Sequence, residues 1–112
     1  MPAREGGAVL VIAVYSTPHG RMVLVTDEDL VGRSFVDQED GYILMVPESI
    51  YSGKLVEEDE AALEISRADI IVATGEKAVG LVVGLGLASP ESVISIRGVP
   101  HVQVYKLSSD SL

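Results

Sequence analysis

Two hydrophobic patterns alternate along the chain: short runs rich in Val, Ile and Leu, and segments with apolar residues at helical spacing. The runs at 8–15, 22–26 and 42–46 predict three strands. The first two are joined by Thr17-Pro18-His19-Gly20, a connection short enough for an antiparallel hairpin. Between 27 and 41 the Asp, Gly and Ser residues predict an irregular segment that ends in a turn.

The helical patterns lie in the second half of the chain. Four carboxylates at 57–60 match the positive end of a helix dipole, so we expect a helix from there to about Arg67, with a narrow apolar face of Ala61, Ile65 and Ala68. A short strand is predicted at 69–73, in a βαβ-like unit.

A second helix is predicted over 76–86, with most of its surface buried. Its Gly80 and Gly84 lie one turn apart, and we interpret them as the contact for a close neighbouring backbone. Gly75 opens this helix after a strand, as in a phosphate-binding loop, but the Gly-Lys-Ser/Thr of a Walker loop is missing.

The closing segment 93–105 predicts a β-hairpin folded about Gly98–Pro100. With a three-residue loop, Arg97 lies opposite His101 and Ser95 opposite Gln103, so these four residues share one polar face while Ile and Val fill the other. Arg97 and His101 suit an anionic ligand, through a forked donor and a titratable donor. An ordinary solvated face is the alternative.

These elements predict a single mixed α/β (α+β) domain over 8–107, approximately β-β-β-α-β-α-β-β, with flexible ends at 1–7 and 108–112. Hydrophobic residues make up 47% of the chain but aromatic residues only 4%. This aliphatic surplus exceeds what so small a body hides, so we expect a homodimer.

Composition narrows the function classes. The 17 acidic and 8 basic residues give a net charge of -9, which disfavours nucleic acid as a partner. The absence of cysteine excludes disulfides, thiolate catalysis and Cys-based zinc sites. The two histidines lack zinc spacing, so we expect no metal and no cofactor. The apolar run at 8–14 is too short to span a membrane, and we expect a cytoplasmic protein.

No catalytic motif stands out, and the catalytic residues, if any, are unknown. No serine occurs in Gly-x-Ser-x-Gly, and no Ser/His/Asp set is suggested by order or spacing. One further turn, Tyr51-Ser52-Gly53-Lys54, combines an aromatic and a basic residue and is a candidate partner contact.

Several segments together resemble one known family. They are Val23-Leu24-Val25 followed by 27–32, Tyr51-Ser52-Gly53, the stretch 68–70 leading to 75–79, Gly86-Leu87 before Pro90-Glu91, and 96–104. In order and spacing the chain resembles a small archaeal family defined only as domain of unknown function 424. The resemblance implies an archaeal protein that accompanies translation factors, and hence a protein partner in translation. A saline archaeal cytoplasm would also account for the acidity.

Two functions from different classes remain. The first is a non-enzymatic binding or adaptor module that contacts its partner through Arg97, His101 and Gln103, with Ser95, Tyr51 and Lys54 as further candidates. The second is a small-molecule enzyme or sensor in which Arg97 anchors an anion and His101 transfers or senses protons. A concave pocket that contains Arg97, His101 and either a second cation or an inward-pointing helix N-terminus would favour the second function, and a flat, solvated hairpin face would exclude it.

Overall fold

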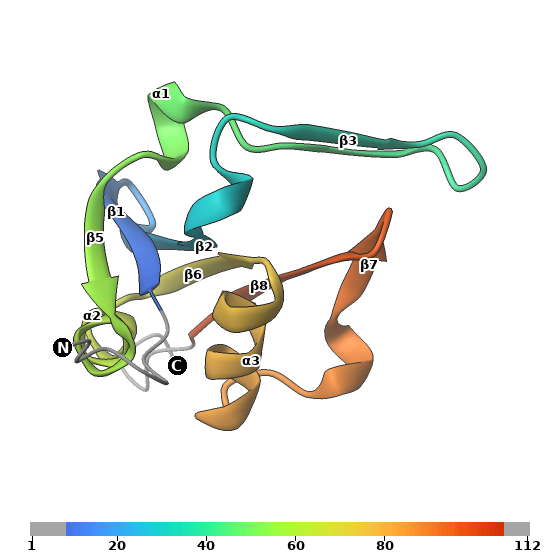
Figure 1. Cartoon of the computed structure of the whole chain (residues 1–112). Coiled ribbons are helices and arrows are strands. Elements are labelled where there is room, and N and C mark those ends of the chain that lie inside the picture. Colours follow the sequence, from blue (N-terminus) through green and yellow to red (C-terminus); the bar gives the residue numbers. More distant parts are fainter. Residues whose placement is uncertain (1–8, 107–112) are drawn as a thin grey trace, which may run out of the picture.

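A six-stranded mixed sheet forms the body of the protein, in the strand order β5-β1-β2-β6-β8-β7 (Figure 1). Its strands are β1 (Val9–Thr17), β2 (Gly20–Asp27), β5 (Lys54–Glu57), β6 (Ile70–Thr74), β7 (Ile94–Ile96) and β8 (Val99–Tyr105). The structure is a computed structural model and describes residues 9–106. The predicted flexible ends, 1–7 and 108–112, lie outside the described residues.

The pairing of the strands follows the hydrophobic runs. β1 and β2 form the predicted hairpin, with Thr17 opposite Gly20 across a two-residue turn. β2 and β6 are parallel, and the other neighbouring strands of the sheet are antiparallel. The mixed α/β architecture and the C-terminal hairpin are therefore confirmed.

Two helices cover one face of this sheet, α2 (Glu58–Ser66) and α3 (Glu76–Gly84) (Figure 1). The predicted apolar face of α2 is buried, with Ala61 and Ile65 fully enclosed and Ala68 nearly so. From the sheet, alternate residues such as Val23, Val25 and Ile71 complete the main core.

The glycine stripe on α3 does not act as predicted. Among residues 9–106, no atom lies within 4 Å of a Cβ placed on Gly80 or Gly84, and both glycines are exposed. No backbone of the described chain therefore approaches this side of the helix, and the packing interpretation of the two glycines was wrong.

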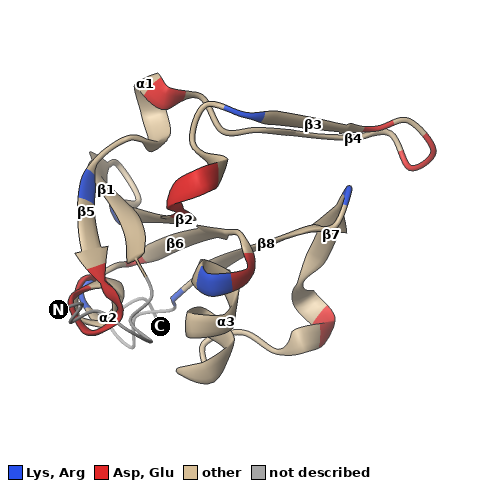
Figure 2. Cartoon of the chain, in the orientation of Figure 1, with Lys and Arg blue, Asp and Glu red and all other residues tan. Residues whose placement is uncertain are grey.

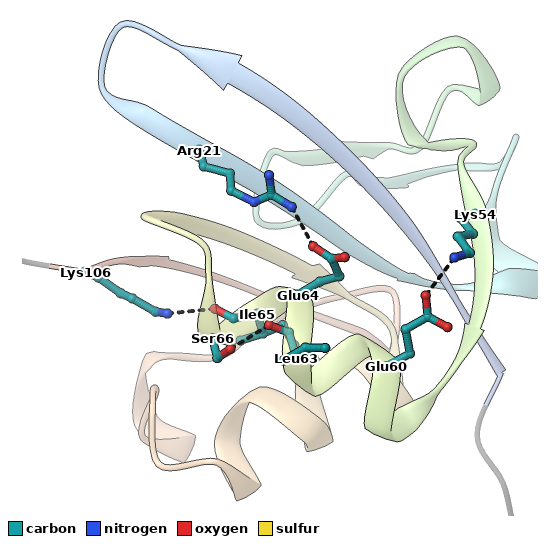
Figure 3. Close-up of polar contacts among 8 residues, drawn as sticks. All are labelled: Arg21, Lys54, Glu60, Leu63, Glu64, Ile65, Ser66 and Lys106. Carbon is teal, nitrogen blue, oxygen red and sulfur yellow. Dashed lines mark hydrogen bonds and ion pairs between the residues drawn. The ribbon is translucent and has the colours of Figure 1, made fainter.

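Polar contacts join α2 to β2, to β5 and to the residue that follows β8 (Figure 3). The Arg21 guanidinium lies 2.6 Å from a Glu64 carboxylate oxygen, and the Lys54 ammonium lies 2.8 Å from that of Glu60. The Lys106 ammonium donates a hydrogen bond of 2.7 Å to the Ile65 carbonyl. Exposed ion pairs of this kind add little stability each, but they orient the helix over the sheet.

A two-stranded arm projects from the opposite side of the molecule (Figure 1). It consists of β3 (Ser34–Asp37) and β4 (Tyr42–Met45), which pair only with each other among the described strands. The short helices η1 (Glu28–Leu30) and α1 (Glu48–Tyr51) flank the arm, and η2 (Pro90–Ser92) precedes β7. The segment 27–41, which was expected to be irregular, thus contains the strand β3. Helix α1 and strand β5 were also absent from the predicted order of elements.

Candidate functional site

The β7–β8 turn has a different register from the one predicted. Ile96 lies opposite Val99, Ser95 opposite Pro100 and Ile94 opposite His101. The turn therefore contains only Arg97 and Gly98, with φ of 54° and 82°. Positive φ at both central residues is the signature of a type I′ turn, whose twist matches that of the strands it joins.

In this register the four predicted residues do not form one polar face. Because opposed residues share a face, Ser95 lies with Pro100 on one side of the sheet, and His101 lies with Ile94 on the other. Arg97 stands at the tip of the turn and belongs to neither row. His101 and Gln103 do share a face, as predicted, so two of the four residues expected on the polar face lie together.

His101 is a buried residue of the sheet. Its Nδ1 lies 3.0 Å from the Thr74 hydroxyl, and its Nε2 lies 3.4 Å from Nε2 of Gln103. Burial lowers the pKa of His101, because water is removed from the charged form. The ring therefore remains neutral at pH 7, bonded within the protein.

His101 ends a row of polar residues across three strands. Thr26, Thr74 and His101 are directly opposed on β2, β6 and β8, and all three are buried. The Thr26 hydroxyl has no hydrogen-bond partner among the described residues. Gln103 and Tyr105 continue along β8 towards solvent, where the Tyr105 hydroxyl donates to the Gln103 side-chain oxygen at 3.3 Å.

Tyr51 and Lys54 do not share an exposed turn. The Tyr51 ring is half-buried between two apolar clusters, one on the sheet and one beneath the arm, and burial raises its pKa. Lys54 begins β5 and pairs with Glu60, which raises the pKa of the Lys54 ammonium (Figure 3). Both side chains are thus occupied by contacts within the protein.

Arg97 lines an open groove of about 940 Å³ between the arm and the β7–β8 turn. Among the described residues, the lining consists of residues 33–39 and Arg97, with none from β4. The groove therefore follows the edge of β3 that faces away from β4. His101 is not part of this lining, so Arg97 and His101 do not meet in one pocket.

A second arginine faces the same groove. Arg33 precedes β3, and its guanidinium lies 4.9 Å from the centre of the Phe35 ring, a cation–π contact. Figure 2 shows basic segments at the base of the arm and at the tip of the β7–β8 turn, and an acidic segment at the end of the arm. That acidic end contains Asp37, Glu39 and Asp40.

The free edge of β3 carries unpaired backbone groups. The Arg33 carbonyl accepts the Val46 N–H, and the Asp37 carbonyl accepts the Gly41 N–H, so both point towards β4. Backbone groups alternate along a strand. Ser34 and Val36 therefore direct their N–H and C=O groups into the groove.

The two faces of the arm differ in character. Leu44 faces the body and is buried against Val46 and Ile96, with Phe35 beside them. The other face is apolar and open, with Val36, Ile43 and Met45 exposed by 47%, 64% and 60%. Exposed apolar side chains in one continuous patch are typical of interaction surfaces.

The chain matches a known protein family. The family described as "Protein of unknown function (DUF424)" matches residues 14–107. The chain belongs to this family. It is also similar to the crystal structure of an uncharacterized conserved protein from Methanopyrus kandleri, with 32% sequence identity and a TM-score of 0.74 over 90% of this chain and 96% of that one. No curated protein matches the chain.

In this DUF424 protein the first turn of α3 is closed to anions by an internal carboxylate. Asp27, at the end of β2, accepts the N–H of Ala78 at 2.8 Å and that of Lys77 at 3.1 Å. A Cβ on Gly75 would lie 2.3 Å from the Asp27 Cγ, so only glycine admits the carboxylate so near. The helix start is a structural cap and not a phosphate site.

Two further findings bear on the site. Within residues 9–106, no group of three His, Cys, Asp or Glu side chains could hold a metal ion. No helix in that range is long and apolar enough to cross a membrane.

The strand predicted at 42–46 is β4 of the arm, but Arg33, β3 and the pairing of β3 with β4 were not predicted from the sequence. The signal in the sequence was limited to the β-prone pair Phe35-Val36, separated by a turn-forming tetrapeptide, 38–41, from the run at 42–45. Only two apolar residues lie between the polar residues at 33–34 and at 37–40, which is too short a run to predict a strand.

Proposed function

We propose that this DUF424 protein is a non-enzymatic binding module whose working surface is the groove along β3. An extended segment of a protein partner adds to the free edge of β3 as a further strand, and Arg33 and Arg97 hold acidic side chains of that segment. The observation that carries the proposal is the meeting of two arginines, 64 positions apart in sequence, on one groove that follows an unpaired strand edge.

Strand addition fits the edge of β3 on three counts. Backbone groups of Ser34 and Val36 point into the groove, where a partner strand would satisfy them. The strand contains no proline, lysine or bulge of the kind that protects edges from pairing. The patch of Val36, Ile43 and Met45 would extend under an added strand.

Arg97 occupies a position that its turn does not favour. The first central residue of a type I′ turn is normally Asn, Asp or Gly, because other side chains lose about 1 kcal/mol in the left-handed region. Arg97 stands there with φ 54°. The turn itself gives no reason for an arginine at this position. A contact between its guanidinium and an anionic group of a partner provides such a reason.

The net charge of -9 favours selectivity at this site. Most of the surface repels acidic chains, and the pair of arginines marks one place where an acidic side chain is attracted. A protein partner with acidic residues in an extended segment fits better than a nucleic acid, which needs a broad basic surface.

The test is site-specific photo-crosslinking in the native cell. A photoreactive residue in place of Gln38, which is exposed and lines the groove, should yield one dominant adduct whose crosslinked peptide is extended and acidic. Arg97→Asn and Arg33→Gln should each abolish the adduct. Arg67→Gln is the matched control, because Arg67 is exposed at the end of α2 on the opposite face.

The crosslinked partner peptide then allows a binding measurement. Loss of one hydrogen-bonded charged contact should weaken binding about tenfold or more in Arg97→Asn, by fluorescence anisotropy. An adduct that survives both groove substitutions, or a peptide that binds the variants as tightly as the unsubstituted protein, overturns the proposal.

A further inference from the structure

The edge of β3 is complementary to itself. The segment Arg33-Ser34-Phe35-Val36-Asp37 carries a positive charge two residues before Phe35 and a negative charge two residues after it. If two copies of this edge run antiparallel about Phe35, Arg33 of each copy lies opposite Asp37 of the other. Opposed residues of opposite charge stabilise an antiparallel pair.

The backbone has the same symmetry. In that register Ser34 lies opposite Val36 of the other copy, and these are the residues whose N–H and C=O groups point away from β4. Each such pair forms two hydrogen bonds, and the two-fold axis repeats it. A register shifted by one residue would set backbone groups that already bond to β4 against the new strand, so pairing about Phe35 is favoured.

We infer that a second copy of this chain pairs with β3, giving a continuous four-stranded sheet β4-β3-β3-β4 across a two-fold axis. The inference rests on the proposed role of this edge in strand addition, and the second copy is its occupant when no partner segment is bound. The two charge contacts and the hydrogen bonds make the interface isologous.

Side-chain packing supports the same arrangement. Val36, Ile43 and Met45 of both copies would form one apolar face across the joined arms. A two-stranded hairpin in isolation is only marginally stable, whereas a four-stranded sheet with an apolar face is more stable.

The other edge strands of the described residues are β4, β5 and β7, and they fit less well. β4 contains no charged residue that could pair with a second copy. β5 begins with Lys54, an edge-protecting residue already paired with Glu60, and β7 is only three residues long. Neither presents charges in a self-complementary order about a central residue.

Sedimentation of the purified full chain tests the dimer. Because the interface is small, we expect monomer and dimer to exchange between about 5 and about 500 µM. Arg33→Asp places like charges opposite each other twice and should raise the dissociation constant about tenfold or more. Arg67→Asp, an equal change of charge on the opposite face, should leave it unchanged.

Cysteine crosslinking tests the register, because the chain contains no cysteine of its own. Ser34→Cys and Val36→Cys are exposed substitutions, and mixing the two variants should give an oxidised heterodimer, since these positions face each other. Neither Ser34→Cys nor Gln38→Cys alone should crosslink efficiently.

The experiments distinguish failure of the dimer from failure of the proposed partner binding. A chain that stays monomeric at about 500 µM overturns the dimer and leaves the proposed partner binding intact. A dimer that ignores Arg33→Asp, or a mixture that gives no heterodimer, shows that copies associate elsewhere and also overturns the inference. If the dimer behaves as expected while photo-crosslinking in the cell finds only a second copy, the inference holds and the proposed partner does not.

Discussion

Removal of the Asp27 carboxylate should destabilise the whole fold, because this side chain joins the end of β2 to the start of α3. The N-cap residue of α3 is Gly75, which has no side chain to cap the helix. Asp27, only 7% exposed, supplies the missing acceptors from a strand about fifty residues earlier. Asp27→Ala is therefore both a helix-cap deletion and the loss of a long-range contact.

The size of the effect follows from the two hydrogen bonds. A bond to a charged acceptor contributes about 1.5–3 kcal/mol, and a carboxylate at a helix N-terminus adds about 0.3–1 kcal/mol. Lys77 is exposed, so water can replace the carboxylate at its N–H, whereas Ala78 is buried and its N–H would be left unbonded. We expect Asp27→Ala to lower the free energy of unfolding by about 3 kcal/mol, and Asp27→Asn, which keeps one acceptor oxygen, by about half as much.

Urea denaturation followed by circular dichroism measures these differences, and a melting curve should show a decrease of about 10–20 °C in Tm for Asp27→Ala. The matched control is Asp29→Ala, an exposed carboxylate two residues away that should change stability by less than about 0.5 kcal/mol. If Asp27→Ala and Asp29→Ala unfold alike, the cap has no energetic role and the reasoning is refuted.

Three further predictions concern the glycines Gly75 and Gly80, the buried histidine and the turn arginine. Gly75→Ala should lower the free energy of unfolding by about 3 kcal/mol or more in urea titrations, because the new Cβ would overlap the capping carboxylate and the residue has φ +109°. Gly80→Ala should raise it by about 0.5–1 kcal/mol, because that helix position has open space around it, and equal effects of the two substitutions would contradict this reasoning. His101 has a lowered pKa in the folded state, so the free energy of unfolding should fall as pH drops from about 6.5 through that pKa, and His101→Gln but not His19→Gln should remove this loss. Arg97→Asn should raise Tm slightly, since Asn suits the type I′ turn, and a lower Tm would show that the arginine stabilises the isolated fold.

The hydrophobic pattern was sufficient for most of the body of the protein, although not for β5. The aliphatic segments 10–13 of β1, 23–25 of β2 and 71–73 of β6 are buried on both faces, and α2 starts within its run of carboxylates, so local pattern and tertiary burial agree. Within the arm, β4 corresponds to the strand predicted at 42–46, but β3 could not be predicted in the same way. β3 has four residues, and its place depends on Leu44 and Val46 packing against Ile96, a contact between segments some fifty residues apart.

The glycines of α3 show a related limit of sequence patterns. Gly80 and Gly84 have the spacing of a helix-packing motif, yet the space beside them is open. Gly75, which the pattern linked only weakly to phosphate, is the glycine that a close contact requires. Spacing along a helix identifies which residues share a side, but the neighbour on that side is fixed by the rest of the fold.

The C-terminal hairpin shows how one residue of register changes a functional hypothesis. A loop of three residues, 98–100, and a turn of two, Arg97-Gly98, both leave aliphatic residues to pair, so the sequence does not choose between them. The shorter turn requires a non-glycine residue at positive φ, which is uncommon and has no clear signature in the sequence. With it, His101 pairs with Ile94 and is buried beside Thr74, while Arg97 moves to the tip and faces the groove along β3. The expected pair of a titratable base and an anion-binding cation is thus divided between a buried histidine of the sheet and an arginine at the turn, and only the arginine enters our proposal of partner recognition.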